Sequence, residues 1–315
     1  MADLLDTISN DLNLPRALLD SALDGAGHKF RKVVFKKRNG GTRVAIQPAA
    51  ELKPILAWLD SVIFSKLPVS KIAMAFLPGT SIVKNAREHR DSLFSVRVDL
   101  ENFFGSITSG DLILAINECG IIVPDFSKSA SSIKIIQKSC FDKNDRLPIG
   151  YLTSPRIANA VMFGFDNALL DILADKSKFG TAVLTRYADD FIFSTNKRGA
   201  CRTFANEIEK LLKSWSSPRL KINAEKTRYM SRDGGSTLIT GLRVKQDGEI
   251  GVHANYRDHV RLLLKLYAAA KLKSDDVARL EGHLAFVQFA DPQLFTRLSF
   301  KYSNEIASVR NGSRD

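Results

Sequence analysis

Two adjacent aspartates interrupt an apolar stretch whose sequence is Thr185-Arg186-Tyr187-Ala188-Asp189-Asp190-Phe191-Ile192-Phe193-Ser194. Apolar or β-favouring residues flank the pair, with Val183 and Leu184 before it and Phe191 to Phe193 after it. Such residues favour half-buried strands, and Ala-Asp-Asp suits a tight turn between two of them. The stretch therefore predicts a β-hairpin with two carboxylates at its tip, although an Asp-Asp pair taken alone is more often simply a solvated turn.

A third aspartate, Asp99, follows the alternating, β-branched run Leu93–Val98, which predicts a strand. Residues 100–104 leave this strand. Two strand-borne carboxylates that converge can hold a pair of Mg²⁺ ions about 3.5–4 Å apart, the arrangement that stabilises the attacking and leaving oxygens in phosphoryl transfer. Mg²⁺ commonly takes one or two carboxylates plus substrate phosphates. The hypothesis is that Asp99 and Asp189 meet at such a centre, which spacing alone leaves open.

The composition is that of a globular protein with a basic excess. The chain has 315 residues, of which 44% are hydrophobic and 25% charged, and its formal net charge is +12. A basic excess of this size favours a polyanionic partner such as nucleic acid, although a merely basic soluble protein remains compatible with it. No apolar stretch is long enough to cross a bilayer. Cys119, Cys140 and Cys201 show no disulfide or zinc pattern, so the expected location is the reducing cytoplasm.

Hydrophobic periodicity predicts a strand-rich centre followed by an all-helical tail, with a boundary near residue 245. The expected strands are a hairpin within 30–46, then 93–98, the aspartate hairpin, 220–223 and 237–244. The expected helices are 3–23, 52–67, 109–119, 131–140, 156–173, 201–212, 256–271, 275–288 and 292–307.

Several polar residues outside the aspartates are candidates for binding. The basic hairpin carries Lys36, Lys37, Arg38 and Arg43, which could contact a triphosphate or a template backbone, with Arg43 the best candidate because it lies inside a strand pattern. Each is also compatible with a solvated basic turn. The loop 147–155 precedes a helix that Pro155 opens, and its Gly150 allows a backbone to approach a ligand closely.

These pieces together resemble a reverse transcriptase. Residues 98–104 look like the first catalytic motif of that family, and residues 147–155 resemble its nucleotide-binding loop. Tyr187-Ala188-Asp189-Asp190 resembles its hallmark box, and Asn223-Ala224-Glu225-Lys226-Thr227 resembles the lysine motif that follows. Four motifs in the right order form a specific signal, whereas any one alone would be weak.

Two shorter elements narrow the resemblance to bacterial retron reverse transcriptases. Asn85-Ala86-Arg87-Glu88-His89 is similar to the NAxxH pattern of that group, and Ile239-Thr240-Gly241 is similar to its VTG element. Asp291-Pro292 followed by a helix resembles the thumb of these enzymes. Departures are Ile149 in place of a common glutamine, Leu152 in place of a common proline, and Ile239 in place of valine.

The resemblance implies an α+β, right-hand polymerase fold: fingers and N-terminal region at 1–98, a palm at 99–244 with a finger insertion between the catalytic motifs, and a helical thumb at 245–315. The antiparallel sheet of the palm would pack on helices. It implies that Asp99, Asp189 and the Leu100 carbonyl hold two Mg²⁺ ions, one activating the primer hydroxyl and one orienting the triphosphate, with Asp190 in support. Phe104 would act as a steric gate against ribonucleotides, although a phenylalanine judged alone is as often a core residue. Further implied roles are nucleotide binding (Arg43, Gly150, Lys226) and RNA recognition (Asn85, His89, Thr240, Gly241).

By the same resemblance, the enzyme would use dNTPs to copy a cognate structured non-coding RNA into multicopy single-stranded DNA. Synthesis would start from the 2′-OH of a branching guanosine and give a 2′–5′ linked RNA–DNA hybrid. The system would serve anti-phage defence through a separately encoded effector protein. Two alternatives stay open: a defence-associated or group II intron-like reverse transcriptase with different priming, and a non-catalytic RNA-binding or antitoxin module. An RNA-copying RNA polymerase is disfavoured by Phe104 and by Tyr187-Ala188.

Overall fold

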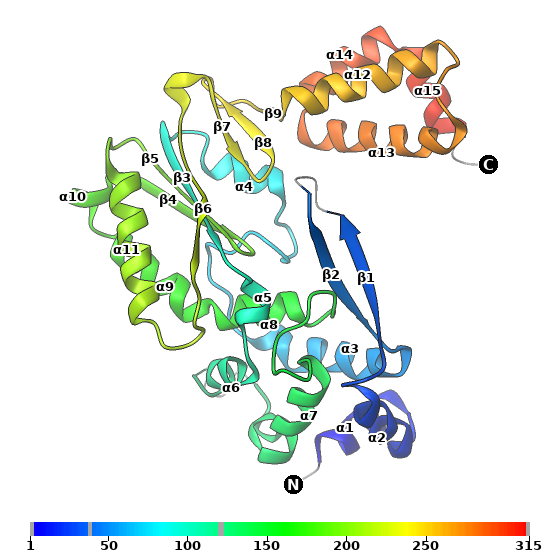
Figure 1. The fold of residues 1–315 in the computed structure, drawn as a ribbon, viewed down its shortest axis with the longest axis vertical. Helices are drawn as coiled ribbons and strands as arrows, with labels where there is room; N and C mark the ends of the chain where they lie inside the picture. The colour runs from blue at the N-terminus through cyan, green and yellow to red at the C-terminus, as the bar shows by residue number, and fades with distance from the viewer. Residues whose placement is uncertain (1–2, 37–39, 119–122, 313–315) are drawn as a thin grey trace.

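The N-terminal third of the chain combines short helices with a long hairpin. The computed structural model describes residues 3–36, 40–118 and 123–312 (Figure 1). Lys37, Arg38 and Cys119 lie outside these residues. The elements in order are α1 (Leu4–Leu12), α2 (Arg16–Gly25), β1 (Phe30–Lys36), β2 (Thr42–Pro48), η1 (Ala50–Leu52), α3 (Lys53–Val62), η2 (Phe64–Lys66) and α4 (Ile82–Glu88). Strands β1 and β2 pair antiparallel, which confirms the predicted basic hairpin.

A four-stranded sheet forms the centre of the molecule. Its strands are β3 (Phe94–Leu100), β4 (Ala182–Tyr187), β5 (Asp190–Thr195) and β6 (Ile222–Ser231). They lie in the order β4-β5-β3-β6, and every neighbouring pair is antiparallel. The two strands around the aspartate pair are thus confirmed, whereas β6 continues to Ser231, well past the predicted end at residue 223.

Helices cover both faces of the central sheet, and the side chains of each strand point alternately to these two faces. Val96, Val98, Phe191 and Phe193 belong to one large core, which also contains residues of the helices α9 (Phe163–Leu173) and α11 (Ala200–Ser214). Ile192 points to the opposite face, where it packs in a second core with residues of α4. Strands buried on both sides in this way need apolar or hydrogen-bonded residues at every position, which is why the sequence around the aspartates is so rich in phenylalanine and isoleucine.

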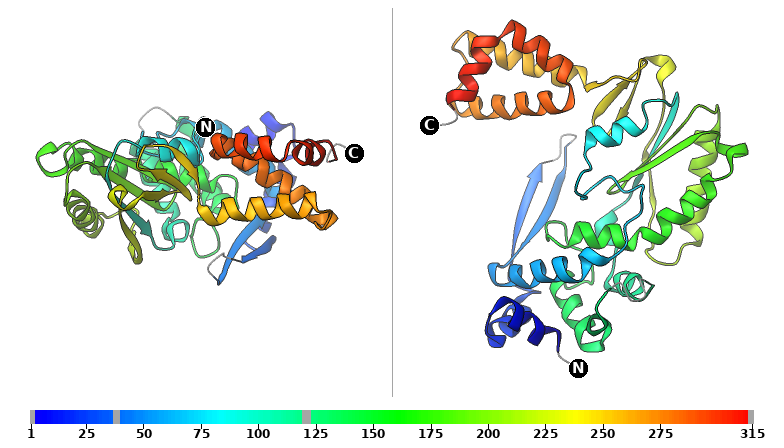
Figure 2. Two further views of the ribbon diagram at one scale, coloured as in Figure 1. Left: turned by 90° about the horizontal axis from the view of Figure 1, so that it is seen from above. Right: turned by 180° about the vertical axis from the view of Figure 1, so that it is seen from behind.

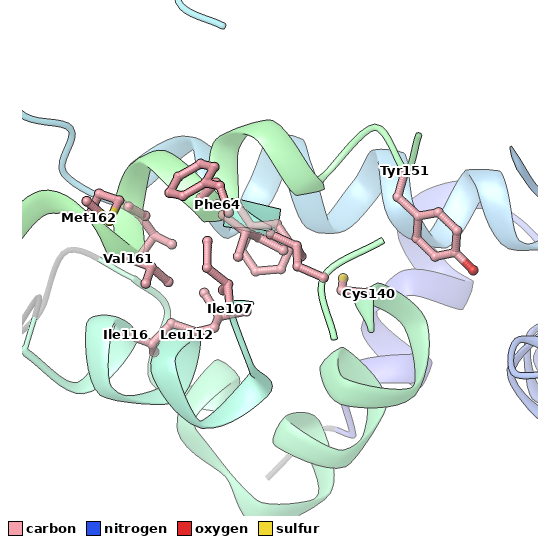
Figure 3. Close-up of a cluster of buried hydrophobic side chains, with 14 of the residues drawn as sticks. Phe64, Ile107, Leu112, Ile116, Cys140, Tyr151, Val161 and Met162 are labelled. Atoms are coloured by element: carbon pink, nitrogen blue, oxygen red, sulfur yellow. The ribbon is translucent and has the colours of Figure 1, made fainter. Parts of the chain in front are cut away.

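The chain between β3 and β4 is mostly helical. Its helices are α5 (Phe103–Ser106), α6 (Ser109–Glu118), α7 (Ala130–Cys140), α8 (Ser154–Val161), α9 (Phe163–Leu173) and α10 (Lys176–Phe179), with η3 (Asp125–Lys128) between α6 and α7. Figure 3 shows part of their shared core, including Phe64, Ile107, Leu112 and Met162. The single helix predicted at 156–173 is two helices, which meet at the completely buried Met162.

The last part of the chain is a small sheet followed by four helices. Elements after β5 are α11 (Ala200–Ser214), β6, η4 (Arg232–Gly234), β7 (Ser236–Ile239), β8 (Leu242–Lys245), β9 (Ile250–Val252), α12 (Ala254–Ala268), α13 (Ser274–Ala290), α14 (Pro292–Lys301) and α15 (Ser303–Gly312). The helix predicted at 292–307 is divided between α14 and α15. These four helices gather at one end of the molecule, and the β1–β2 hairpin extends in their direction (Figures 1 and 2).

The architecture agrees with the predicted α+β class, in which an antiparallel sheet packs on helices. In the part of the chain that the structure describes, no helix is long and apolar enough to cross a membrane.

Candidate active site

The central strands bring Asp99 beside the aspartate hairpin. Asp99, near the end of β3, is the register partner of Asp190 at the start of β5. The N–H of Leu100 donates to the carbonyl of Asp189 at 2.9 Å, so that a backbone hydrogen bond joins the end of β3 to the turn before β5. The side chain of Asp99 is buried, with 2% of its surface exposed. Three carboxylates thus lie at one end of the sheet: Asp99 on β3, Asp190 on β5 and Asp189 in the turn before β5.

Burial and mutual repulsion shape the charge state of this group. Burial raises the pKa of Asp189, the nearby Asp99 raises it further, and Arg43 and Lys226 partly offset this rise. Lys226 Nζ lies 2.7 Å from Asp99 Oδ1. Arg43 stands on β2 and Lys226 on β6, so elements from distant parts of the chain surround the two aspartates. The structure brings together four of the residues that the sequence singled out.

Asp190 has a different partner, Arg97, which the sequence analysis missed. Arg97 Nε and Nη2 donate to the two carboxylate oxygens of Asp190, each at 2.8 Å. Burial raises the pKa of Asp190 to about 6, and the forked Arg97 contact opposes that rise. Arg97 precedes Asp99 by two residues, so strand alternation places both on one face and could have identified it. Both carboxylate oxygens of Asp190 are thus engaged by Arg97, whose Nη2 also lies 3.8 Å from Asp99 Oδ2.

The residues at the tip fit a divalent cation through a small set of hard oxygen donors. Among the described residues, no three His, Cys, Asp or Glu side chains form a ready-made metal cluster, and the carboxylate of Asp190 is bound to Arg97. Asp99 and Asp189 remain as carboxylates close to one another: burial raises the pKa of Asp189, and the neighbouring charge of Asp99 adds to that rise. One or two carboxylates completed by substrate phosphates are the set that Mg²⁺ commonly takes in proteins.

The loop before α8 packs against the basic hairpin. The N–H of Ile46, on β2, donates to the carbonyl of Ile149 at 2.6 Å. Gly150 has φ +112°, and a Cβ on it would lie 2.7 Å from the Ile46 carbonyl oxygen. A side chain there is excluded both by the backbone conformation and by contact with another backbone. In this structure Gly150 makes room for the backbone of Ile46, and its contact with a nucleotide stays a prediction.

Phe104 lies five residues after Asp99, in the short helix α5, and is half-buried. Its ring makes edge-to-face contacts with Phe103, at 5.3 Å between centroids, and with Phe76, at 6.2 Å. Phe103 belongs to the core with 4% of its surface exposed, whereas Phe76 is 50% exposed. Phe104 thus stands at the border between core and surface, beside the strand that carries Asp99.

The expectation that Asn85 and His89 contact RNA is not compatible with their burial. Their side chains, in and just after α4, are 0% and 1% exposed. His89 Nδ1 lies 2.6 Å from Ser194 Oγ and His89 Nε2 lies 2.8 Å from Thr185 Oγ1. The histidine thereby ties the end of α4 to both strands of the aspartate hairpin. We correct the prediction: His89 stabilises the support of the hairpin, whereas the side-chain amide of Asn85 is buried without a hydrogen-bond partner among the described residues.

The stability of the protein is expected to fall as the pH falls below about 6.5, because burial lowers the pKa of His89 to about 3. Between these values the unfolded chain binds a proton on His89 and the folded chain does not, so stability present above pH 6.5 is lost towards pH 3, by up to about 1.4 kcal/mol per pH unit. Urea unfolding between pH 7.5 and 5 checks this, with His89→Gln expected to have a flatter dependence. His28→Gln, at an exposed histidine, is the matched control and should keep the wild-type slope. An equal slope in His89→Gln would contradict the assignment.

Thr240 and Gly241 form the two-residue turn between β7 and β8. Both have positive φ, +45° and +85°, as a type I′ turn requires. Thr240 Oγ1 donates to the carbonyl of Ile82 at the start of α4, at 3.3 Å. Gly241 is exposed and Thr240 is half-buried, so the turn stays a predicted RNA contact with an additional packing role.

A buried ion pair behind the hairpin is the second feature that sequence reasoning missed. Arg186 and Asp166 are both 0% exposed, and Arg186 Nε and Nη2 donate to the Asp166 carboxylate at 2.7–3.0 Å. Arg186 Nη1 donates to Asn159 Oδ1 at 3.1 Å and to the carbonyl of Ala188 at 3.3 Å. Ala188 has φ +58° in the turn before Asp189. Arg186 therefore holds the turn that presents Asp189, and links it to α8 and α9.

Comparison with known proteins gives one family model that matches the chain. This model, the reverse transcriptase (RNA-dependent DNA polymerase) family, matches residues 35–264. The retron Ec73 reverse transcriptase of Escherichia coli is 36% identical over 286 residues, which cover 89% of this chain and 89% of the relative. The retron Ec83 reverse transcriptase of Escherichia coli is 26% identical over 292 residues, which cover 90% of each.

Solved structures show a similar fold at low sequence identity. The apo telomerase of Candida tropicalis superposes with a TM-score of 0.53 at 11% identity, over 89% of this chain and 59% of the telomerase chain. This likeness concerns the fold alone, and it agrees with the expected right-hand arrangement of the polymerase.

Proposed function

Since this chain belongs to the reverse transcriptases, and within them to the bacterial retron enzymes, it is an RNA-directed DNA polymerase, and we propose that it copies a cognate structured non-coding RNA into multicopy single-stranded DNA. In this proposal synthesis starts from the 2′-OH of a branching guanosine and leaves a 2′–5′ linked RNA–DNA hybrid. The observation that carries the catalytic part is the contact of Asp99 with the Asp189 turn on adjacent strands.

Reverse transcriptases use divalent metal ions, and we propose Mg²⁺ held by Asp99 and Asp189, with the Leu100 carbonyl as a further ligand. When bound, such ions lower the pKa of an attacking hydroxyl and stabilise the charge on the phosphates. The chain's own residues hold the carboxylates in position. Asp99 is fixed by burial and by Lys226, while Arg97 keeps Asp190 ionised and in place.

Two positively charged side chains at the centre, those of Lys226 and Arg43, suit the phosphates of an incoming dNTP. The side chain of Lys226 is 57% exposed, so its ammonium group can leave Asp99 when a stronger partner arrives. Arg43 is exposed on β2 and lies close enough to influence the Asp189 carboxylate. We propose that Arg43 contacts the triphosphate and that Lys226 neutralises or protonates the leaving pyrophosphate. Gly150 contributes indirectly, since it allows the nucleotide loop to pack on β2.

Phe104→Ala is expected to weaken the preference for dNTPs over rNTPs, because the proposed role of its ring is to collide with a ribose 2′-OH. A shape-based contact of this kind is worth about 10–200-fold in kcat/KM. Single-nucleotide primer extension with dNTP and rNTP pairs measures the ratio, and synthesis with dNTPs should persist. An unchanged ratio would remove Phe104 from this role.

The division into fingers (1–98), palm (99–244) and helical thumb (245–315) is part of the proposal. The second hydrophobic core contains most buried residues of α12–α14, which supports a helical unit at 245–315, although the same core also includes Ile192 and residues of α4, β7 and β8. The first core joins the N-terminal helices to the central sheet, so the boundary between fingers and palm rests on the resemblance alone. We further propose a cytoplasmic role in anti-phage defence, in which the enzyme and its hybrid restrain a separately encoded effector protein.

The proposed function is tested by co-expression of the chain with its flanking genomic DNA, followed by denaturing gel analysis of extracted nucleic acid. The expected result is a discrete DNA band that shifts after RNase treatment and after debranching. DNA without a branched RNA would retain the polymerase and contradict the priming mechanism. Bound RNA without any DNA would favour a non-catalytic binding module instead.

A further inference from the structure

Phe76 is a half-exposed phenylalanine that belongs to none of the motifs recognised in the sequence. It lies 28 residues before Phe104, in the loop between η2 and α4. Its ring meets the Phe104 ring edge to face, with 6.2 Å between centroids and 65° between planes. The other aromatic neighbour of Phe104, Phe103, is part of the buried core. Of these two ring contacts, only the one with Phe76 is made from the surface.

The backbone of Phe76 adopts a conformation that bulky residues avoid. Its φ is +64°, in the left-handed region where the Cβ of an L-residue crowds the following carbonyl. Backbone strain of this kind persists only where the surrounding structure imposes it, and it is concentrated at functional sites. The structure around Phe76 should therefore contain contacts that impose this conformation.

Those contacts come from the catalytic hairpin and the helix of the nucleotide loop. The N–H of Arg186 donates to the carbonyl of Ile72, and the N–H of Met74 donates to the carbonyl of Arg186, both at 2.7 Å. Asn159 Nδ2, in α8, donates to the carbonyl of Ala75 at 2.9 Å. Residues 72–75 thus lie along β4 as a short parallel partner. They end directly before Phe76, so its position is coupled to that of the catalytic turn.

We propose that Phe76 is a positioning residue for sugar selection: its ring holds the Phe104 ring where an incoming ribose 2′-OH would collide with it. This inference rests on the proposed role of Phe104 as the steric gate. Phe104 is only half-buried, so the core does not restrain it from every side. A misplacement of about 1 Å in a reacting complex is enough to change rates strongly. Loss of the Phe76 contact would therefore allow the gate to move aside for a ribonucleotide.

The test compares Phe76→Gly with Phe76→Tyr. Glycine adopts a positive φ without strain, so Phe76→Gly removes the ring while it preserves the backbone, and folding is not endangered. Tyrosine retains the ring. The measured quantity is the ratio of kcat/KM for a dNTP to that for the matching rNTP, in single-nucleotide primer extension. Phe76→Gly is expected to lower this ratio about two- to twelvefold relative to wild type, the range that corresponds to the energy of one edge-to-face pair. Phe76→Tyr should keep the wild-type ratio.

Two further variants separate this inference from the proposed gate. Phe104→Ala gives the effect of losing the gate, and in the Phe76→Gly/Phe104→Ala double variant the ratio should equal that of Phe104→Ala alone, because Phe76 acts through Phe104. Phe300→Ala, at a 93% exposed phenylalanine of α14, is the control and should leave the ratio unchanged. A merely structural role for Phe76 would lower kcat for both sugars and leave their ratio intact.

The outcomes are distinguishable. If Phe104→Ala relaxes the dNTP preference and Phe76→Gly does not, the gate stands and the Phe76 inference is wrong. If Phe76→Gly relaxes the preference by the same factor with and without Phe104, Phe76 acts on its own and the inference is again wrong. If Phe104→Ala itself changes nothing, the proposed gate fails and the role of Phe76 fails with it.

Discussion

Asp189→Asn is expected to abolish DNA synthesis while RNA binding is retained. The substitution preserves the size of the side chain but removes the charge that would hold a divalent cation together with Asp99. Loss of one member of a catalytic group lowers kcat by about 10⁴–10⁶-fold. The side chain is not part of the hydrophobic core, so the fold should persist. Primer extension on an RNA template measures synthesis, and fluorescence anisotropy with a labelled RNA measures binding.

Asp91→Asn provides the matched control for this experiment. Asp91 undergoes the same chemical change but lies before β3 with a side chain that is 90% exposed. Synthesis by this variant should stay within about twofold of wild type, as expected for a surface substitution. Substantial synthesis by Asp189→Asn would exclude Asp189 from the catalytic centre, and loss of RNA binding would show that the substitution disturbs more than the charge.

Arg186→Met is expected to destabilise the protein by about 3–5 kcal/mol, the typical effect of removing one partner from a buried ion pair. The cost arises because Asp166 remains buried without its counter-charge. Burial already raises the pKa of Asp166, and Arg186 is the group that opposes this rise. Urea unfolding at pH 7.5 measures the free energy of unfolding. Arg279→Met, which breaks the exposed pair with Asp276, should cost no more than about 1 kcal/mol.

The double variant Arg186→Met/Asp166→Leu separates stability from positioning. Replacing both partners of a buried pair with apolar residues is often neutral or stabilising, so most of the lost stability should return. Synthesis should remain low, because neither new side chain can donate to the Ala188 carbonyl and hold the turn before Asp189. Recovery of full activity together with stability would show that Arg186 has no positioning role.

The local elements were predictable because their signals are local. The alternation of residues 93–98 and the apolar runs around Asp189 predicted β3, β4 and β5, and helical periodicity predicted most helices. The ends of elements were less predictable: β6 extends to Ser231, and the helix expected at 156–173 is interrupted at Met162. The length of β6 is decided by pairing with β3, a partner more than a hundred residues away in the sequence.

Motif spacing alone misassigned the environment of several site residues. The helical spacing of Asn85 and His89 carried no information about which face of α4 is covered by the rest of the protein. Gly150 was rightly identified as a position of close approach, but the approaching backbone is that of Ile46. In each case the deciding neighbour comes from another part of the chain.

By itself the sequence determined the family, the order of the motifs, and the strands that carry Asp99 and Asp189, because periodicity and residue type act over a few residues. Tertiary structure alone decided that Arg97 binds Asp190, that Arg186 is buried against Asp166, and that Phe76 contacts Phe104. The Arg97 and Asp190 side chains are separated by 93 residues, and those of His89 and Ser194 by 105. Contacts at such separations form only when the sheet and its helices pack, since burial, not local propensity, selects the partner of each charge.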